Sequence, residues 1–97
     1  MKNFDIQVEA VFDETGLSLE ELCRCFALAP GWVEERVQAG LLSEVSGAPG
    51  TWRFDAVTLR RVRVMAQIER DFDAVPELAA LVADLQEEVA RLRRRVR

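Results

Sequence analysis

Apolar and polar residues alternate near the start of the chain, from Phe4 to Phe12. A period of two is typical of a strand that buries one face, so the pattern predicts a short strand over residues 4–12. The sequence DETG, residues 13–16, then interrupts the alternation with turn-forming residues. The pattern therefore predicts a β element ahead of a helical region.

A helical period begins at Leu19, because apolar residues recur at spacings of three and four. Ser18 followed three residues later by Glu21 is the pattern of a capping box. Pro30 suits the first turn of a second helix, and Gly40 suits the position just past its end. Two short helices joined by the link ALA predict a helix-turn-helix. Their expected inward residues are Leu19, Leu22, Cys23, Phe26, Val33 and Val37.

The segment SEVSGAPGTWRF, residues 43–54, combines turn residues with short extended pieces. Its place after a helix-turn-helix suggests a wing, with which the strand over residues 4–12 could pair. Asp55 suits the N-cap of a third helix that runs to Phe72. Its expected core residues form two stripes: Val57, Val64 and Ile68, then Leu59, Val62, Ala66 and Phe72. The predicted fold class is mainly α, a MerR-like winged helix-turn-helix over residues 1–72 with a small β-ribbon.

Beyond Pro76, apolar residues are spaced alternately by four and three positions, the heptad pattern of a coiled coil. The positions are Leu78, Val82, Leu85, Val89, Leu92 and Val96. Residues 73–97 are therefore predicted to form a dimerisation helix. The alternative is that this helix packs back on its own domain.

The orientation of the helix pair depends on two opposing patterns. Valine and leucine alternate at the heptad positions, which favours a parallel pair. A parallel pair, however, places two arginine-rich ends side by side. An antiparallel pair sets the tail RLRRRVR against the partner's Asp73, Glu77 and Asp84. We therefore predict an antiparallel homodimer.

Charge is distributed unevenly along the chain. Residues 1–50 contain three basic and nine acidic residues, a net charge of −6, and residues 51–97 contain ten and eight, a net charge of +2. An acidic half attracts basic partners and repels phosphate, which weighs against nucleic acid as the ligand. The sequence has no apolar run of about 20 residues and no signal-peptide pattern, so no membrane association and a cytoplasmic location are expected.

The chain offers little for catalysis or metal binding. It has no histidine, and Cys23 and Cys25 diverge on a helix, so they can neither pair with each other nor form a zinc site. We expect reduced thiols, with a disulfide between chains as the alternative. There is no nucleophile beside a base and no phosphate-binding glycine loop, so no enzyme activity, cofactor or metal is expected.

The segments SLEELC, VEERVQAGLLSE and TWRFD, followed by a long helix, a proline and terminal heptads, resemble the chaperone-modulator family typified by CbpM. That family is related to the MerR-type winged-helix regulators. The resemblance spans residues 4–97 and rests on order and spacing. It implies binding to the J-domain of a DnaJ/CbpA-like co-chaperone and inhibition of its action with the DnaK-type chaperone. J-domains present a basic helix, which an acidic half-domain complements.

The DNA-binding relatives carry a pattern like L-R-x-Y in the second helix, where this chain has Val33, Glu34, Glu35 and Arg36. Carboxylates at this place are repelled by phosphate. Arg53 and Phe54 do match the regulators' arginine–aromatic pair, so a small MerR-like DNA-binding transcriptional regulator remains the alternative. An adaptor for another basic partner is a third possibility.

The candidate partner-binding residues lie on the two short helices: Glu20, Glu21, Trp32, Glu34, Glu35 and Arg36. Trp32 lies off the inward stripe of its helix, one turn before Arg36. A tryptophan beside glutamates is typical of an interface. The alternative is that Trp32 covers the edge of the core.

Overall fold

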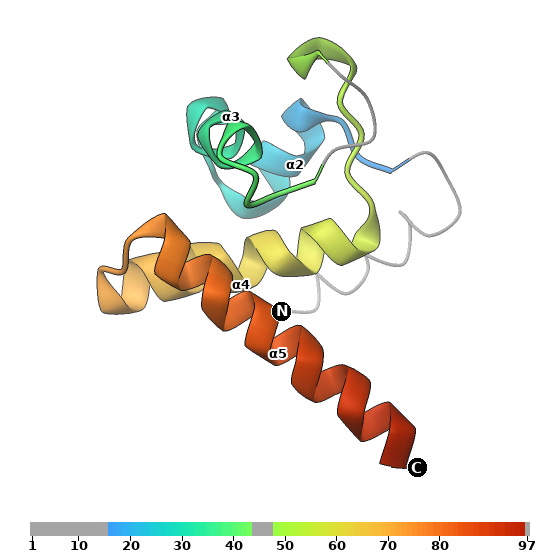
Figure 1. The fold of residues 1–97 in the computed structure, drawn as a ribbon. Helices are drawn as coiled ribbons and strands as arrows, with labels where there is room; N and C mark the ends of the chain where they lie inside the picture. The colour runs from blue at the N-terminus through green and yellow to red at the C-terminus, as the bar shows by residue number, and fades with distance from the viewer. Residues whose placement is uncertain (1–15, 44–47, 97) are drawn as a thin grey trace. The chain divides into compact units, whose positions relative to one another are not determined.

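The computed structural model describes residues 16–43 and 48–96 (Figure 1). Four helices account for most of this part: α2 (Leu19–Phe26), α3 (Pro30–Gln38), α4 (Ala56–Phe72) and α5 (Pro76–Val96), with a short 3₁₀ turn η1 at Pro49–Thr51. The mainly α fold class is thus confirmed. The chain divides into two compact units within α4, one ending at Val62 and the other beginning at Arg63.

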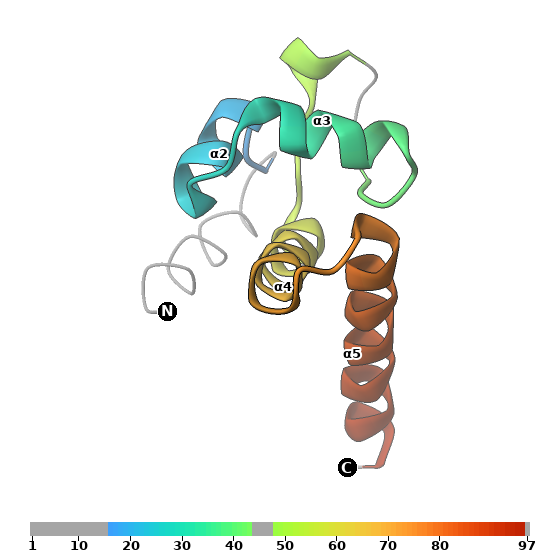
Figure 2. The same ribbon diagram turned by 90° about the vertical axis from the view of Figure 1, so that its left-hand side faces the viewer.

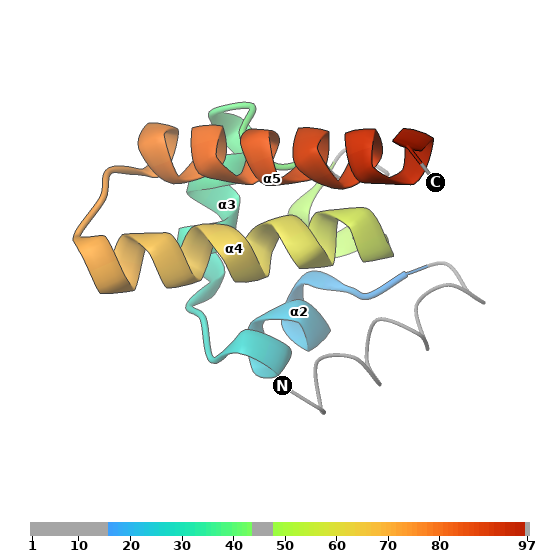
Figure 3. The same ribbon diagram turned by 90° about the horizontal axis from the view of Figure 1, so that it is seen from below.

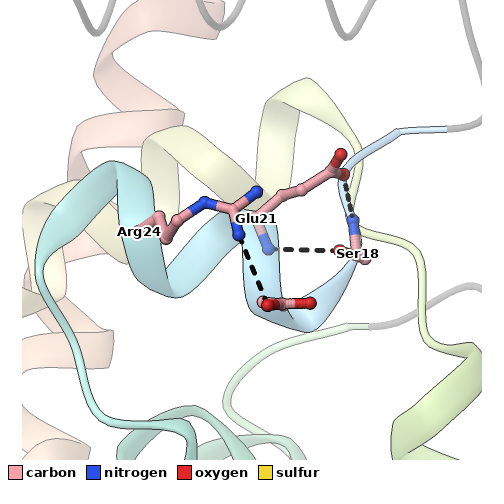
Figure 4. Close-up of polar contacts among 4 residues, drawn as sticks. Ser18, Glu21 and Arg24 are labelled. Atoms are coloured by element: carbon pink, nitrogen blue, oxygen red, sulfur yellow. Dashed lines mark hydrogen bonds and ion pairs between the residues drawn. The ribbon is translucent and has the colours of Figure 1, made fainter.

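The start of α2 is the predicted capping box (Figure 4). The hydroxyl of Ser18 accepts a hydrogen bond from the Glu21 N–H at 3.1 Å, and the Glu21 carboxylate accepts one from the Ser18 N–H at 2.9 Å. These bonds satisfy N–H groups that have no partner inside the helix. Leu22 and Cys23 are buried as predicted, so the cap fixes where the helix begins and which face it buries.

Loss of the cap hydroxyl is expected to destabilise the protein measurably. Ser18→Ala removes the acceptor of the Glu21 N–H, and we expect the free energy of unfolding to fall by about 1 kcal/mol. Urea unfolding followed by circular dichroism measures the change. Ser18→Thr keeps a hydroxyl and serves as the control. Equal stability of Ser18→Ala and the wild type would contradict the role of the cap.

The carboxylate side of the cap makes its contribution dependent on pH. The hydrogen bond from the Ser18 backbone is the main cause that holds the pKa of Glu21 below 4.5. A carboxyl with a lowered folded pKa stabilises the protein above its unfolded pKa, and this stabilisation is lost as the pH falls through the folded value. The stability difference between the wild type and Glu21→Gln should therefore shrink below pH 4.5. An unchanged difference in strong acid would contradict this assignment.

The pair α2 and α3 forms the predicted helix-turn-helix, and the two helices pack against each other (Figure 2). Ala27 adopts a left-handed conformation with φ 55°, which ends α2 and lets the chain turn. Pro30 occupies the first turn of α3, and Gly40 follows that helix with φ +80°. Of the two predicted inward residues of α3, Val33 is fully buried and Val37 is half-buried.

A single antiparallel bridge joins Leu17, which precedes α2 in the chain, to Phe54, which follows α3. The Leu17 N–H donates to the Phe54 carbonyl at 3.0 Å, and the Phe54 N–H donates back at 2.8 Å. Gly16 has φ +91°, and a Cβ there would lie 2.5 Å from the Phe54 carbonyl oxygen, so glycine is required. Within residues 16–43 and 48–96 this bridge is the only β pairing. The predicted strand over residues 4–12 and part of the predicted wing lie outside the described residues, so the β-ribbon stays a prediction.

α4 begins where predicted, because the Asp55 carboxylate accepts a hydrogen bond from the Thr58 N–H at 2.9 Å. Its buried residues are Ala56, Thr58, Leu59, Val62 and Met65. The expected burial of Val57 and Phe72 is wrong, since they are 56% and 72% exposed. A helix can bury two apolar stripes only when neighbours cover both, and a chain of 97 residues has few elements to do so.

After Phe72 the chain reverses through Asp73, which has φ 52°, and α5 returns beside the second half of α4 (Figure 3). Pro76 occupies the predicted first turn of α5. The buried residues of α5 are alanines, namely Ala79, Ala80 and Ala83. Of the heptad residues, Val82 is half-buried and the other five are exposed: Leu78, Leu85, Val89, Leu92 and Val96. The heptad stripe therefore faces solvent over most of its length.

Candidate functional site

The acidic residues of α2 differ in their availability to a partner. Glu20 is 83% exposed and lies 3.4 Å from Arg24 one turn later, an ion pair that is strongly screened by solvent. The Glu21 carboxylate instead accepts the Ser18 N–H in the cap (Figure 4). The Glu20 carboxylate is thus accessible to a partner, whereas the Glu21 carboxylate is engaged in the cap of α2.

On α3, Trp32, Glu35 and Arg36 form one contiguous cluster. The guanidinium carbon of Arg36 lies 4.0 Å from the centroid of the Trp32 ring. Nη1 of Arg36 donates to the Trp32 carbonyl at 2.9 Å and lies 3.4 Å from Oε1 of Glu35. Arg36 is only 7% exposed, while the Glu35 side chain is 79% exposed. The Arg36 side chain is therefore largely inaccessible to a partner, whereas the Glu35 side chain is accessible.

The remaining candidate acid, Glu34, lies on α3 and is half-buried. Burial is the main cause that raises the pKa of the Cys23 thiol, and the charge of Glu34 raises it further. The charge of Glu34 therefore acts on a residue of α2. The candidate acids of α2 and α3 lie in the same compact unit of the chain, and we call the following set the acidic surface: Glu20, Glu34 and Glu35 with Trp32.

Both cysteines are free in the structure, Cys23 buried and Cys25 half-buried. Burial raises the pKa of the Cys25 thiol, and the nearby Glu21 raises it further. A raised pKa reduces the thiolate fraction that reacts with oxidants or metals. Cys25 lines a small hollow with Leu17, Glu21 and Arg24. In the part of the chain that the structure describes, no group of three or more metal-ligating side chains occurs.

The arginine–aromatic pair that matches the DNA-binding relatives is used inside the fold. Nη2 of Arg53 donates to the Gly16 carbonyl at 2.6 Å. Phe54 is fully buried, and its ring lies edge-to-face against Trp52 with centroids 5.9 Å apart. These contacts give both residues a structural role in joining the start of the described chain to the segment before α4.

Sequence reasoning missed the contacts that tie α4 to the segment after α3. Nε of Arg61 on α4 donates to the Leu41 carbonyl at 2.7 Å, and the Thr58 hydroxyl lies 3.5 Å from the Ser43 carbonyl. Together these contacts hold the segment that leaves α3. No local signal in the sequence distinguishes an arginine that bonds to a distant carbonyl from an arginine that is solvated.

Two short helices joined by a three-residue link, with a long helix completing the core, define a helix-turn-helix protein. The chain belongs to the MerR HTH family of regulatory proteins, whose family model matches residues 17–97. No helix in the described ranges is long and apolar enough to cross a membrane.

Curated relatives refine this family assignment. The chain is similar to the chaperone modulatory protein CbpM of Coxiella burnetii, strains Dugway 5J108-111 and RSA 331 / Henzerling II. Each is 28% identical over 81 residues, which is 84% of this chain and 76% of the relative. The resemblance to the chaperone-modulator family is thereby confirmed. No solved structure matches the chain significantly.

Proposed function

We propose that this protein is a chaperone modulator that binds the J-domain of a DnaJ/CbpA-like co-chaperone and inhibits its action with the DnaK-type chaperone. The observation that carries the proposal is the acidic α3 helix, where by resemblance Glu34 stands in the place at which DNA-binding relatives carry arginine, with Glu35 beside it. The curated relatives are named chaperone modulatory proteins, which supports the modulator part of the proposal.

The electrostatics of the acidic surface suit a basic helix as the partner. The Glu20 and Glu35 side chains are 83% and 79% exposed, so their charges are accessible before contact. Complementary charges of this kind accelerate association more than they strengthen the final complex. Trp32 is half-buried, and a tryptophan of this type can add apolar contact area once the helices meet.

A finer part of the proposal concerns assembly. We propose a cytoplasmic homodimer in which the α5 helices form an antiparallel coiled coil, and a winged element formed with the residues ahead of α2. Leu85 and Leu92 are 57% and 44% exposed, so their burial against a second copy would remove apolar surface from water.

Titration of the purified protein with the J-domains of its host tests the function. We expect calorimetric binding that weakens steeply with salt, since exposed charges are screened beyond about 8 Å at physiological ionic strength. We also expect the protein to suppress J-domain stimulation of the DnaK-type ATPase. Absence of both binding and suppression would overturn the proposal, and binding of a different basic protein would favour the adaptor interpretation.

The second candidate is a small DNA-binding transcriptional regulator, which membership of the MerR HTH family favours. Glu34 and the internal hydrogen bond of Arg53 to Gly16 speak against it. We expect only weak binding in a gel-shift assay with duplex DNA, even at low salt. Sequence-specific binding with a dissociation constant below about 1 µM would instead support the regulator.

A further inference from the structure

Arg36 is a buried cation that contacts Trp32 and Glu35, two residues of the acidic surface. We propose that Arg36 is a positioning residue that holds Trp32 and Glu35 as one recognition unit, and that this unit accepts a lysine or arginine side chain from a partner helix. The proposal rests on the proposed function and deepens it, because it identifies which groups of the acidic surface recognise the partner.

The geometry indicates that Arg36 holds Trp32 in place and does not itself contact the partner. Arg36 is 7% exposed, so its guanidinium is not available to a partner. Nη1 is fixed by the Trp32 carbonyl at 2.9 Å, and the guanidinium carbon lies 4.0 Å from the indole centroid. The same residue therefore holds both the backbone and the ring of Trp32. A ring held in this way loses little further freedom when a partner binds.

The Glu35 carboxylate keeps capacity for an incoming cation. Its Oε1 lies 3.4 Å from Nη1 of Arg36, which is a long contact, and its side chain is 79% exposed. An exposed carboxylate attracts a cation through charge-assisted hydrogen bonds, and the half-buried Trp32 adds apolar contact area for the stem of the incoming side chain. The chemistry of the unit thus fits a basic side chain on a helix.

Lysine at position 36 would keep the positive charge but would lose the contacts that hold Trp32. An arginine guanidinium is planar, stacks on an aromatic ring and presents its donors in fixed directions. A lysine ammonium is a compact charge on a flexible stem, so it neither stacks nor fixes its donors. We expect Arg36→Lys to raise the dissociation rate of the host J-domain by about 5- to 10-fold. The association rate and its salt dependence should stay unchanged, because the net charge is unchanged. Arg24→Lys, at the exposed arginine paired with Glu20, is the matched control and should leave both rates unchanged.

A double-mutant cycle separates positioning from a general structural role. Trp32→Leu should also raise the dissociation rate, and adding Arg36→Lys to it should have little further effect. Trp32→Phe keeps a smaller ring and should lie between the wild type and Trp32→Leu. In NMR spectra, the side-chain protons of Arg36 should be shifted upfield by the indole and lose this shift in Trp32→Leu. Melting curves identify any variant that fails to fold, in which case the Trp32 series alone carries the test.

Each outcome decides between the two proposals. If the wild type does not bind the J-domain, the proposed function fails and the recognition unit fails with it. If the wild type binds and Arg36→Lys dissociates at the wild-type rate, only the positioning role is overturned. The same holds if the effect of Arg36→Lys is equally large in the presence and absence of Trp32, or if Trp32→Leu leaves dissociation unchanged.

Discussion

Reversal of Glu34 and Glu35 to lysine is expected to slow association with the J-domain by about 10-fold or more at low salt. The change replaces two negative charges of α3 by two positive ones, so a basic helix is repelled where it was attracted. Stopped-flow kinetics over a range of ionic strengths measure the effect. The difference between the variant and the wild type should decrease as salt screens the charges.

A control with the same change in net charge distinguishes local from global electrostatics. Asp71 and Glu87 are exposed and lie on α4 and α5, away from the acidic surface in the sequence. Reversing both to lysine alters the total charge equally and should slow association much less. Equal slowing by the two double variants would mean that net charge, and not the α3 helix, attracts the partner.

Leu85→Asp is expected to convert the proposed homodimer to monomers. Leu85 is 57% exposed and lies in the middle of the heptad stripe. In a paired helix it would be covered by the partner, and burying an unpaired carboxylate there is strongly unfavourable. Sedimentation velocity measures the oligomeric state. Ala90→Asp adds the same charge off the stripe and should leave the dimer intact, whereas a monomeric wild type would refute the dimer.

The orientation of the helices can be measured with spin labels at position 94, in a variant without Cys23 and Cys25. In an antiparallel pair centred on Leu85 the two labelled backbones lie roughly 27 Å apart, because each residue of a helix rises 1.5 Å. A parallel pair brings them to about 10 Å, the usual distance between helix axes. Short label separations would therefore replace the antiparallel arrangement by a parallel one.

Features that depend on neighbouring residues in the chain were predictable from the sequence. Ser18 with Glu21, and the prolines at positions 30 and 76, marked the helix starts that the structure confirms. Each signal acts within one helical turn, so it needs no knowledge of the fold. The spacing of Trp32 and Arg36 was visible for the same reason.

Features that depend on distant segments were not predictable in this way. The burial of Arg36 and the hydrogen bond from Arg61 to Leu41 follow from how elements pack, and similar arginines elsewhere are solvated. The exposure of Val57 and Phe72 has the same origin, because an apolar period shows which residues could be buried but not whether a neighbour covers them. The availability of each candidate site residue was therefore known only from the structure.

The bridge between Leu17 and Phe54 gives the helix pair the topology of a closed loop. The two hydrogen bonds, at 3.0 and 2.8 Å, join the residues on either side of α2 and α3, so neither helix lies at a free end of its unit. Closure of this kind is a long-range contact, which forms slowly during folding and is lost cooperatively. The acidic surface should consequently persist or disappear as a whole, with its amide protons exchanging together rather than fraying helix by helix.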